Sequence, residues 1–139
     1  MSSIALPQGL APTVITAIET LQATFDKSEI HVQSDGAGGA RLYLEPIEVG
    51  PKYMPSSTWL GGHLVAQLPY ADIYPLFARG DLARRDGKPL GAGLSSGHAF
   101  LNRPAVQISR RSNRKDPSVE TAADKFLKVL EWLSRHQGQ

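Results

Sequence analysis

The strongest constraint on the fold is an apolar stripe close to the end of the printed sequence. Apolar residues recur there at the spacing of a helix face, and we place Lys125, Lys128 and Glu131 on the other face. Asp116 can cap this helix, and Pro117 suits its first turn. We therefore predict an amphipathic helix over residues 117–135, which must bury one face against another layer. The stripe consists of Val119, Ala123, Phe126, Leu127, Leu130 and Leu133.

A second helical stripe lies near the start of the chain. Pro12 suits a first helical turn, because its missing N–H costs nothing there. The spacing predicts a helix over residues 12–26, preceded by a flexible leader over residues 1–10. The stripe is formed by Val14, Ile15, Ile18, Leu21 and Phe25.

Between the two helices, alternating apolar and polar residues indicate strands. Residues 30–33 and 41–44 alternate on either side of the turn-forming segment 35–39, which predicts a β-hairpin. Residues 64–68 form a largely apolar run that ends at Pro69, and we predict a third strand there.

The segment 69–104 is rich in proline and glycine, so we predict an irregular surface segment with at most one short strand. Long ordered loops are often functional. Residues 105–109 are predicted to be extended. The fold class is α+β: an N-terminal helix, an antiparallel β-meander of three to four strands, a long irregular active-site loop and a C-terminal helix, in a single domain over residues 11–136.

The 139 residues include no cysteine. This excludes disulfides, cysteine–zinc sites, iron–sulfur clusters and a thiol nucleophile. No apolar run approaches the ~20 residues of a membrane span, so we expect a cytoplasmic protein. The net charge of +2 argues against a global polycation but not against a local basic patch.

Short motifs give little support for nucleotide or hydrolase chemistry. Residues 93–97 read Gly-Leu-Ser-Ser-Gly and match G-x-S-x-G, but that motif needs a strand before it and a helix after it. A flexible loop is the favoured interpretation. The segment around Gly87-Lys88 fails the phosphate-loop pattern, because Pro89 replaces the hydroxyl residue. The four histidines show no metal-binding spacing, so we expect no metal and no cofactor.

A basic run offers a candidate binding surface. Five cations fall within a short stretch that contains no aromatic residue, which argues against a base-stacking platform. The alternatives are a solvated loop and a docking patch for an acidic protein surface, a phosphate or nucleic acid. The cations are Arg103, Arg110, Arg111, Arg114 and Lys115.

The order of elements, with several short motifs, resembles the ubiquitin-conjugating (E2) fold, in particular the divergent bacterial E2-like proteins. His98 resembles the histidine of the family's His-Pro-Asn region, and the position of the family's cysteine falls at Ile108, beside Ser109. The resemblance spans residues 11–134. Its other motifs are Pro69, Asp72, Tyr74-Pro75, Asp116-Pro117 and Glu131-Trp132-Leu133.

The resemblance implies an acyl carrier that works with an E1-like activating enzyme, a ubiquitin-like protein and a target protein. Without cysteine, Ser109 is the positional candidate to carry the acyl group as an oxyester. Ser112, Ser95 and Ser96 are reserves. His98 would act as the base or would only orient the loop, and Arg110 and Arg111 would stabilise developing negative charge. His98 is followed by Ala99-Phe100 rather than Pro-Asn, so the family's asparagine is missing at its place.

The absence of cysteine is also compatible with a chain that carries no acyl group. Such a chain would be a non-catalytic E2 variant that binds a partner, or one whose native cysteine was replaced. A third class is a basic nucleic-acid or phosphate-binding domain, although we expect nucleic acid less than protein. The E2 interpretation requires residues 98–115 to cross the meander as an extended loop before the last helix.

Overall fold

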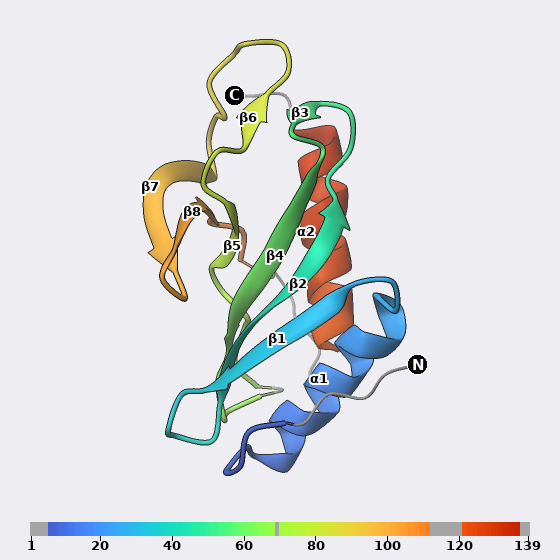
Figure 1. The fold of residues 1–139 in the computed structure, drawn as a ribbon, viewed down its shortest axis with the longest axis vertical. Coiled ribbons are helices and arrows are strands. Elements are labelled where there is room, and N and C mark those ends of the chain that lie inside the picture. Colours follow the sequence, from blue (N-terminus) through green and yellow to red (C-terminus); the bar gives the residue numbers. More distant parts are fainter. Residues whose placement is uncertain (1–5, 69, 112–120, 137–139) are drawn as a thin grey trace.

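A six-stranded antiparallel sheet carries both helices on one face (Figure 1). The computed structural model describes residues 6–68, 70–111 and 121–136. The strand order in the sheet is β1-β2-β4-β5-β8-β7, and β3 pairs separately with β6. The elements are α1 (Pro12–Thr24), β1 (Glu29–Ser34), β2 (Ala40–Glu48), β3 (Tyr53–Met54), β4 (Ser57–Leu64), β5 (Leu76–Arg79), β6 (Ala83–Arg84), β7 (Leu94–Phe100), β8 (Arg103–Ile108) and α2 (Ala122–Arg135).

The α+β class and the two terminal helices are confirmed, with one difference in where α2 begins. Thr121 is the N-cap of α2: its side chain accepts from the Asp124 N–H, and the Asp124 side chain accepts from the Thr121 N–H. This reciprocal capping box starts the helix at Ala122, later than predicted. Asp116 and Pro117 lie outside the described residues.

The predicted hairpin is confirmed as β1 and β2, with Val32 opposite Leu42. The third strand was predicted too late in the chain. It is β4 (Ser57–Leu64), and residues 65–68 form a turn. The alternation of apolar and polar residues is hard to see in this strand, because two of its positions are Gly61 and Gly62, which have no side chain. A Cβ at Gly61 would lie 2.5 Å from the Leu42 carbonyl oxygen, so glycine permits this close strand packing.

The long irregular loop predicted over residues 69–104 is wrong, because β5, β6 and β7 lie within it. β5 is only four residues long, and the five central residues of β7 are all exposed, so neither strand shows a clear alternation. Residues 98–108 likewise do not cross the sheet as an extended loop. They belong to an antiparallel β7–β8 hairpin that continues the sheet beyond β5.

The core lies between the helices and the sheet. Ile18 and Leu21 of α1 and Phe126 of α2 are fully buried together with the inward side chains of the strands. Leu10 also joins this core, so packed chain begins before residue 11. A smaller cluster around Trp59 occupies the other face of the sheet.

Candidate anion-binding site

The structure does not bring His98 and Ser109 together. His98 pairs with Ala105 in the hairpin, so about 13 Å of strand separates it from Ser109. The His98 Nε2 atom lies 3.0 Å from the Ser95 Oγ atom instead. Ser109 accepts a hydrogen bond at Oγ from the Gln107 side-chain amide, at 3.1 Å. Ser112 lies outside the described residues.

The basic run is divided between two faces. The Arg103 guanidinium lies 4.9 Å from the Tyr43 ring centroid and 3.6 Å from the Glu45 carboxylate, in the smaller cluster. Arg110 and Arg111 follow β8 and are exposed. Arg114 and Lys115 lie outside the described residues.

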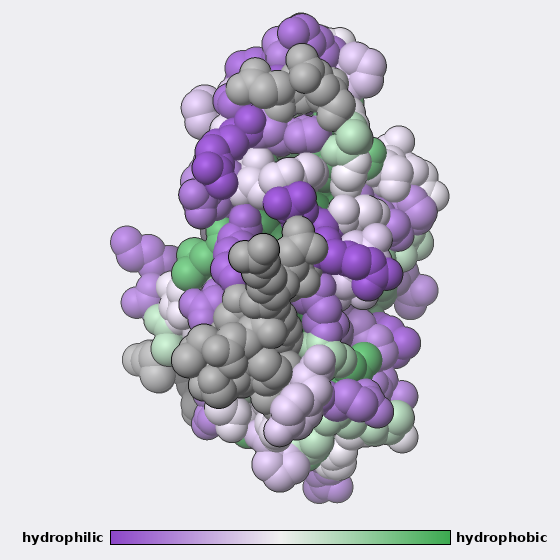
Figure 2. Space-filling view, turned by 180° about the vertical axis from the view of Figure 1, so that it is seen from behind, coloured by the Kyte–Doolittle hydropathy of each residue, from purple (hydrophilic) through white to green (hydrophobic). Residues whose placement is uncertain are grey.

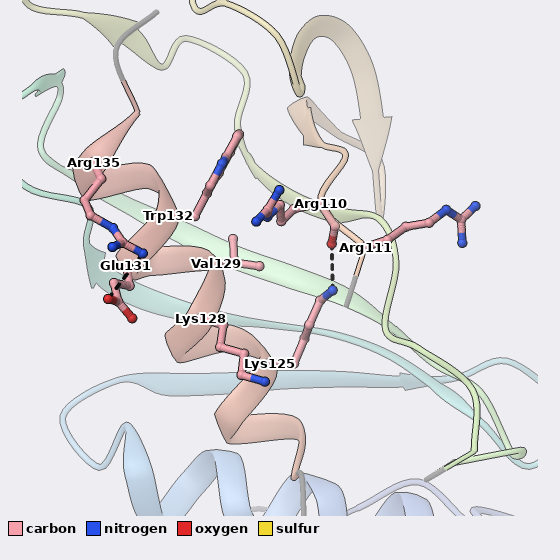
Figure 3. Close-up of a pocket in the computed structure, with 8 residues that line it drawn as sticks. All are labelled: Arg110, Arg111, Lys125, Lys128, Val129, Glu131, Trp132 and Arg135. Atoms are coloured by element: carbon pink, nitrogen blue, oxygen red, sulfur yellow. Dashed lines mark hydrogen bonds and ion pairs between the residues drawn. The ribbon is translucent and has the colours of Figure 1, made fainter. Parts of the chain in front are cut away.

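Arg110 and Arg111 line a cavity of about 230 Å³ together with α2 (Figure 3). Figure 3 shows the Arg110 guanidinium directed toward Trp132, whereas the Arg111 side chain extends away from the helix. Figure 2, the view from behind Figure 1, shows hydrophilic side chains gathered across the middle of this face. We call this cavity the cationic pocket. Its lining residues are Arg110, Arg111, Lys125, Lys128, Val129, Glu131, Trp132 and Arg135.

Among its lining residues, the cationic pocket has more basic side chains than carboxylates. Arg135 is paired with Glu131 at 3.4 Å, and Lys125 lies 3.2 Å from Asp72. Among the residues that the structure describes, no carboxylate lies within ion-pairing distance of Arg110 or Arg111. Each arginine packs over an aromatic ring, which positions its charge.

Lys125 fixes the floor of the pocket. Its side chain is 5% exposed, and its ammonium donates to the Arg110 carbonyl oxygen at 2.6 Å as well as pairing with Asp72. A buried ammonium needs such partners to offset its lost hydration. Lys125 therefore links three segments that are distant in the sequence and holds the backbone at Arg110 against α2.

Two side chains pack against the Trp132 ring, which is partly buried. The Arg110 guanidinium lies 5.7 Å from its ring centroid, and the His136 ring lies 4.6 Å away at a tilt. A Cβ at Gly93 would also come within 2.9 Å of the indole. The pocket therefore offers charge and hydrogen-bond donors rather than an open ring face.

The α2 residues of this pocket were not predicted as binding residues. We placed Lys125 and Lys128 on the solvent face, but Lys125 is buried. The available signal was the spacing of Lys125, Lys128, Trp132 and Arg135, which puts them along one side of a helix. What the sequence does not show is that the end of β8 brings two arginines to the same side.

The described residues hold neither a cluster of metal ligands nor a membrane-spanning helix. No group of three or more histidine, aspartate or glutamate side chains is placed to hold a metal ion. Within the same ranges, no helix has the length and apolar character needed to span a membrane. Comparison with protein-family models, with curated proteins and with solved structures finds no match to this chain.

Proposed function

We propose that this chain is a docking module that binds an anionic group of a partner protein in the cationic pocket. The observation that carries the proposal is the pair Arg110 and Arg111, exposed beside a cavity of about 230 Å³ without a carboxylate partner in the described chain. Guanidinium groups bind carboxylate and phosphate oxygens with two parallel hydrogen bonds. A carboxylate of an acidic protein segment is the ligand that we propose.

The form of the pocket favours a protein partner over nucleic acid. A cavity of this size suits one or two anionic groups, whereas nucleic-acid binding uses a longer track of cations along the phosphate backbone. The Arg110 guanidinium and the His136 ring both pack against Trp132, which disfavours stacking of a base on this ring. The overall charge of +2 also supplies little non-specific attraction for a polyanion.

Binding also fits the separation of His98 from Ser109 better than acyl transfer through Ser109. A serine hydroxyl needs an adjacent base to become a useful nucleophile, and Ser109 has Gln107 as its side-chain partner. The resemblance to ubiquitin-conjugating domains remains part of this proposal. It makes a ubiquitin-like protein, or its E1-like enzyme, the first partner to test.

The test measures binding of a synthetic acidic peptide of about ten residues, rich in Asp and Glu, with a free C-terminal carboxylate. Arg110→Glu should weaken binding by about 10- to 100-fold, because a charged hydrogen bond is replaced by repulsion. Arg41→Glu is the matched control, since Arg41 is exposed on β2, away from the pocket. It changes the net charge equally and should alter binding less than about twofold.

Three further ligands test which kind of anion the pocket binds. A peptide with an amidated C-terminus tests whether a terminal carboxylate is needed, and inorganic phosphate tests simple anion binding. A DNA duplex tests the nucleic-acid alternative. Equal losses with Arg110→Glu and Arg41→Glu would contradict docking at the pocket, as would tight binding of the duplex without binding of the peptide.

A further inference from the structure

We infer that Ser95 is an acyl-acceptor site, activated by His98, for carbonyl groups carried as thioesters or aryl esters. Ser95 is exposed on β7, and its Oγ atom lies 3.0 Å from the His98 Nε2 atom. This is the geometry of a nucleophile with its general base. The inference is independent of the cationic pocket and of Ser109.

A β-bulge creates this pair. In a regular strand, residues three apart point to opposite faces, so Ser95 and His98 would not meet. The register pairs Ser95 with Gln107 but His98 with Ala105, which means that β7 carries one extra residue between them. Gly97, with φ of +84°, lies in this irregularity. The extra residue turns the imidazole onto the face that bears the Ser95 hydroxyl, an effect for which bulges are known near active sites.

The surroundings of Ser95 leave it open to a reactant. The five residues from Ser95 to Ala99 are all exposed in the described structure. Gln107 lies directly across the strand pair from Ser95, and its side-chain amide donates one N–H to the Ser109 Oγ atom and has a second N–H. Cross-strand neighbours are close enough for that amide to approach oxygen atoms bound at Ser95. The site therefore combines a nucleophile, a base and a neighbouring N–H donor.

The step that we propose is a simple acyl transfer. The Ser95 hydroxyl oxygen attacks the carbonyl carbon while His98 Nε2 takes the hydroxyl proton. The carbonyl then re-forms as the bond to the leaving thiolate or phenolate breaks, and the imidazolium returns the proton to that leaving group or to solvent. The product is an ester on Ser95, and His98 is regenerated.

The chain contains its own control. Ser96 is adjacent to Ser95 and is also exposed on the same strand, but no hydrogen bond joins it to a histidine in the described structure. Reaction driven by exposure alone would label both serines. Reaction assisted by His98 would label Ser95.

The experiment treats the full chain with p-nitrophenyl acetate and measures acetylation of each serine by peptide mass spectrometry. We expect Ser95 to be acetylated at least ~10-fold faster than Ser96, a lower bound set beneath the usual gain of about 10²–10⁴ from general-base assistance. His98→Gln keeps a hydrogen-bonding side chain but loses the base. It should lower the acetylation rate of Ser95 to that of Ser96. Arg41→Glu, on the exposed part of β2, should leave Ser95 acetylation unchanged.

Equal labelling of Ser95 and Ser96 in the unmodified protein would overturn the inference. So would full Ser95 labelling in His98→Gln. Circular dichroism and the fluorescence of the two tryptophans establish that each variant keeps its fold before its rate is compared. Because Arg110→Glu tests docking separately, failure at Ser95 is distinguishable from failure of the cationic pocket.

Discussion

At the scale of single residues, Asp35 anchors the loop between β1 and β2. Its Oδ1 atom accepts hydrogen bonds from the Ala37 and Gly39 N–H groups, at 2.7 and 2.9 Å. Its Oδ2 atom lies 2.6 Å from the His63 Nε2 atom on β4. The hydrogen bond from His63 is the largest cause of a lowered pKa for Asp35, with the backbone N–H groups of Ala37 and Gly39 adding to it. One carboxylate therefore joins the loop to the sheet.

The lowered pKa of Asp35 predicts how stability depends on pH. A carboxyl whose pKa is lower in the folded protein stabilises the fold above its ordinary pKa of 3.8, and this contribution is lost as pH falls through the folded value. Asp35→Asn should therefore be less stable than the unmodified chain near pH 6. The difference should shrink in acid, as measured by urea denaturation at a series of pH values.

Asp26→Asn is the control for this measurement. Asp26 is exposed, and no hydrogen bond or ion pair joins it to another described residue. Its replacement should leave the urea midpoint nearly unchanged at every pH. A constant difference between Asp35→Asn and the unmodified chain down to the most acidic point would contradict the role of the Asp35 carboxylate.

At the scale of elements, two neighbouring residues report which face of α2 is buried. Phe126 is fully buried and lies 6.4 Å from the Phe25 ring, whereas Leu127 is 44% exposed. Phe126→Ala should lower the free energy of unfolding by about 3–5 kcal/mol, because it leaves a cavity. Leu127→Ala should cost under about 1 kcal/mol. Chemical denaturation of both variants tests this, and similar losses for the two would show that α2 is rotated from the described position.

The helices were easier to predict than the strands, for a physical reason. A helix such as α2 repeats its apolar stripe over several turns, so the pattern survives one misplaced residue such as Leu127. β7 has only exposed side chains between Leu94 and Phe100, and its bulge breaks the two-residue period. Strand pairing depends on partners far away in the sequence, and no local pattern specifies them.

The candidate site, too, could be predicted only in part from the sequence. Arg110 and Arg111 stand out in the sequence as neighbouring cations and were predicted as binding residues. Their combination with Lys125 and Trp132 depends on how β8 approaches α2. The partner of His98 was also not predictable, because one extra residue in β7 decides which serine it meets.

At the scale of the whole molecule, the β7–β8 hairpin lies beside β5 at one edge of the sheet (Figure 1). Phe100 at the end of β7 stacks on Phe77, with centroids 4.7 Å apart, and lies 6.1 Å from the Trp59 ring. Leu101 and Asn102 turn the chain with positive φ angles, as a tight two-residue hairpin requires. The molecule thus has a second, aromatic cluster that this hairpin closes.

Removing Phe100 should expose Trp59. In a Trp132→Phe background, Trp59 is the remaining tryptophan, because the chain has two. Trp59 is only 2% exposed, so Phe100→Ala should shift its emission to longer wavelength and increase its quenching by acrylamide. Ser96→Ala, on the exposed part of β7, should leave the spectrum unchanged. An unchanged spectrum in Phe100→Ala would mean that the hairpin does not shield Trp59.

The buried ammonium of Lys125 has a thermodynamic consequence for docking. It already ties the backbone at Arg110 to α2 and to Asp72 before any ligand arrives. A ligand then does not have to order these segments, so little conformational entropy is lost on binding. Association should be fast and strongly dependent on ionic strength, as expected when charge steers two rigid surfaces together. In a chain without Lys125, the ligand would have to order these segments itself as it binds.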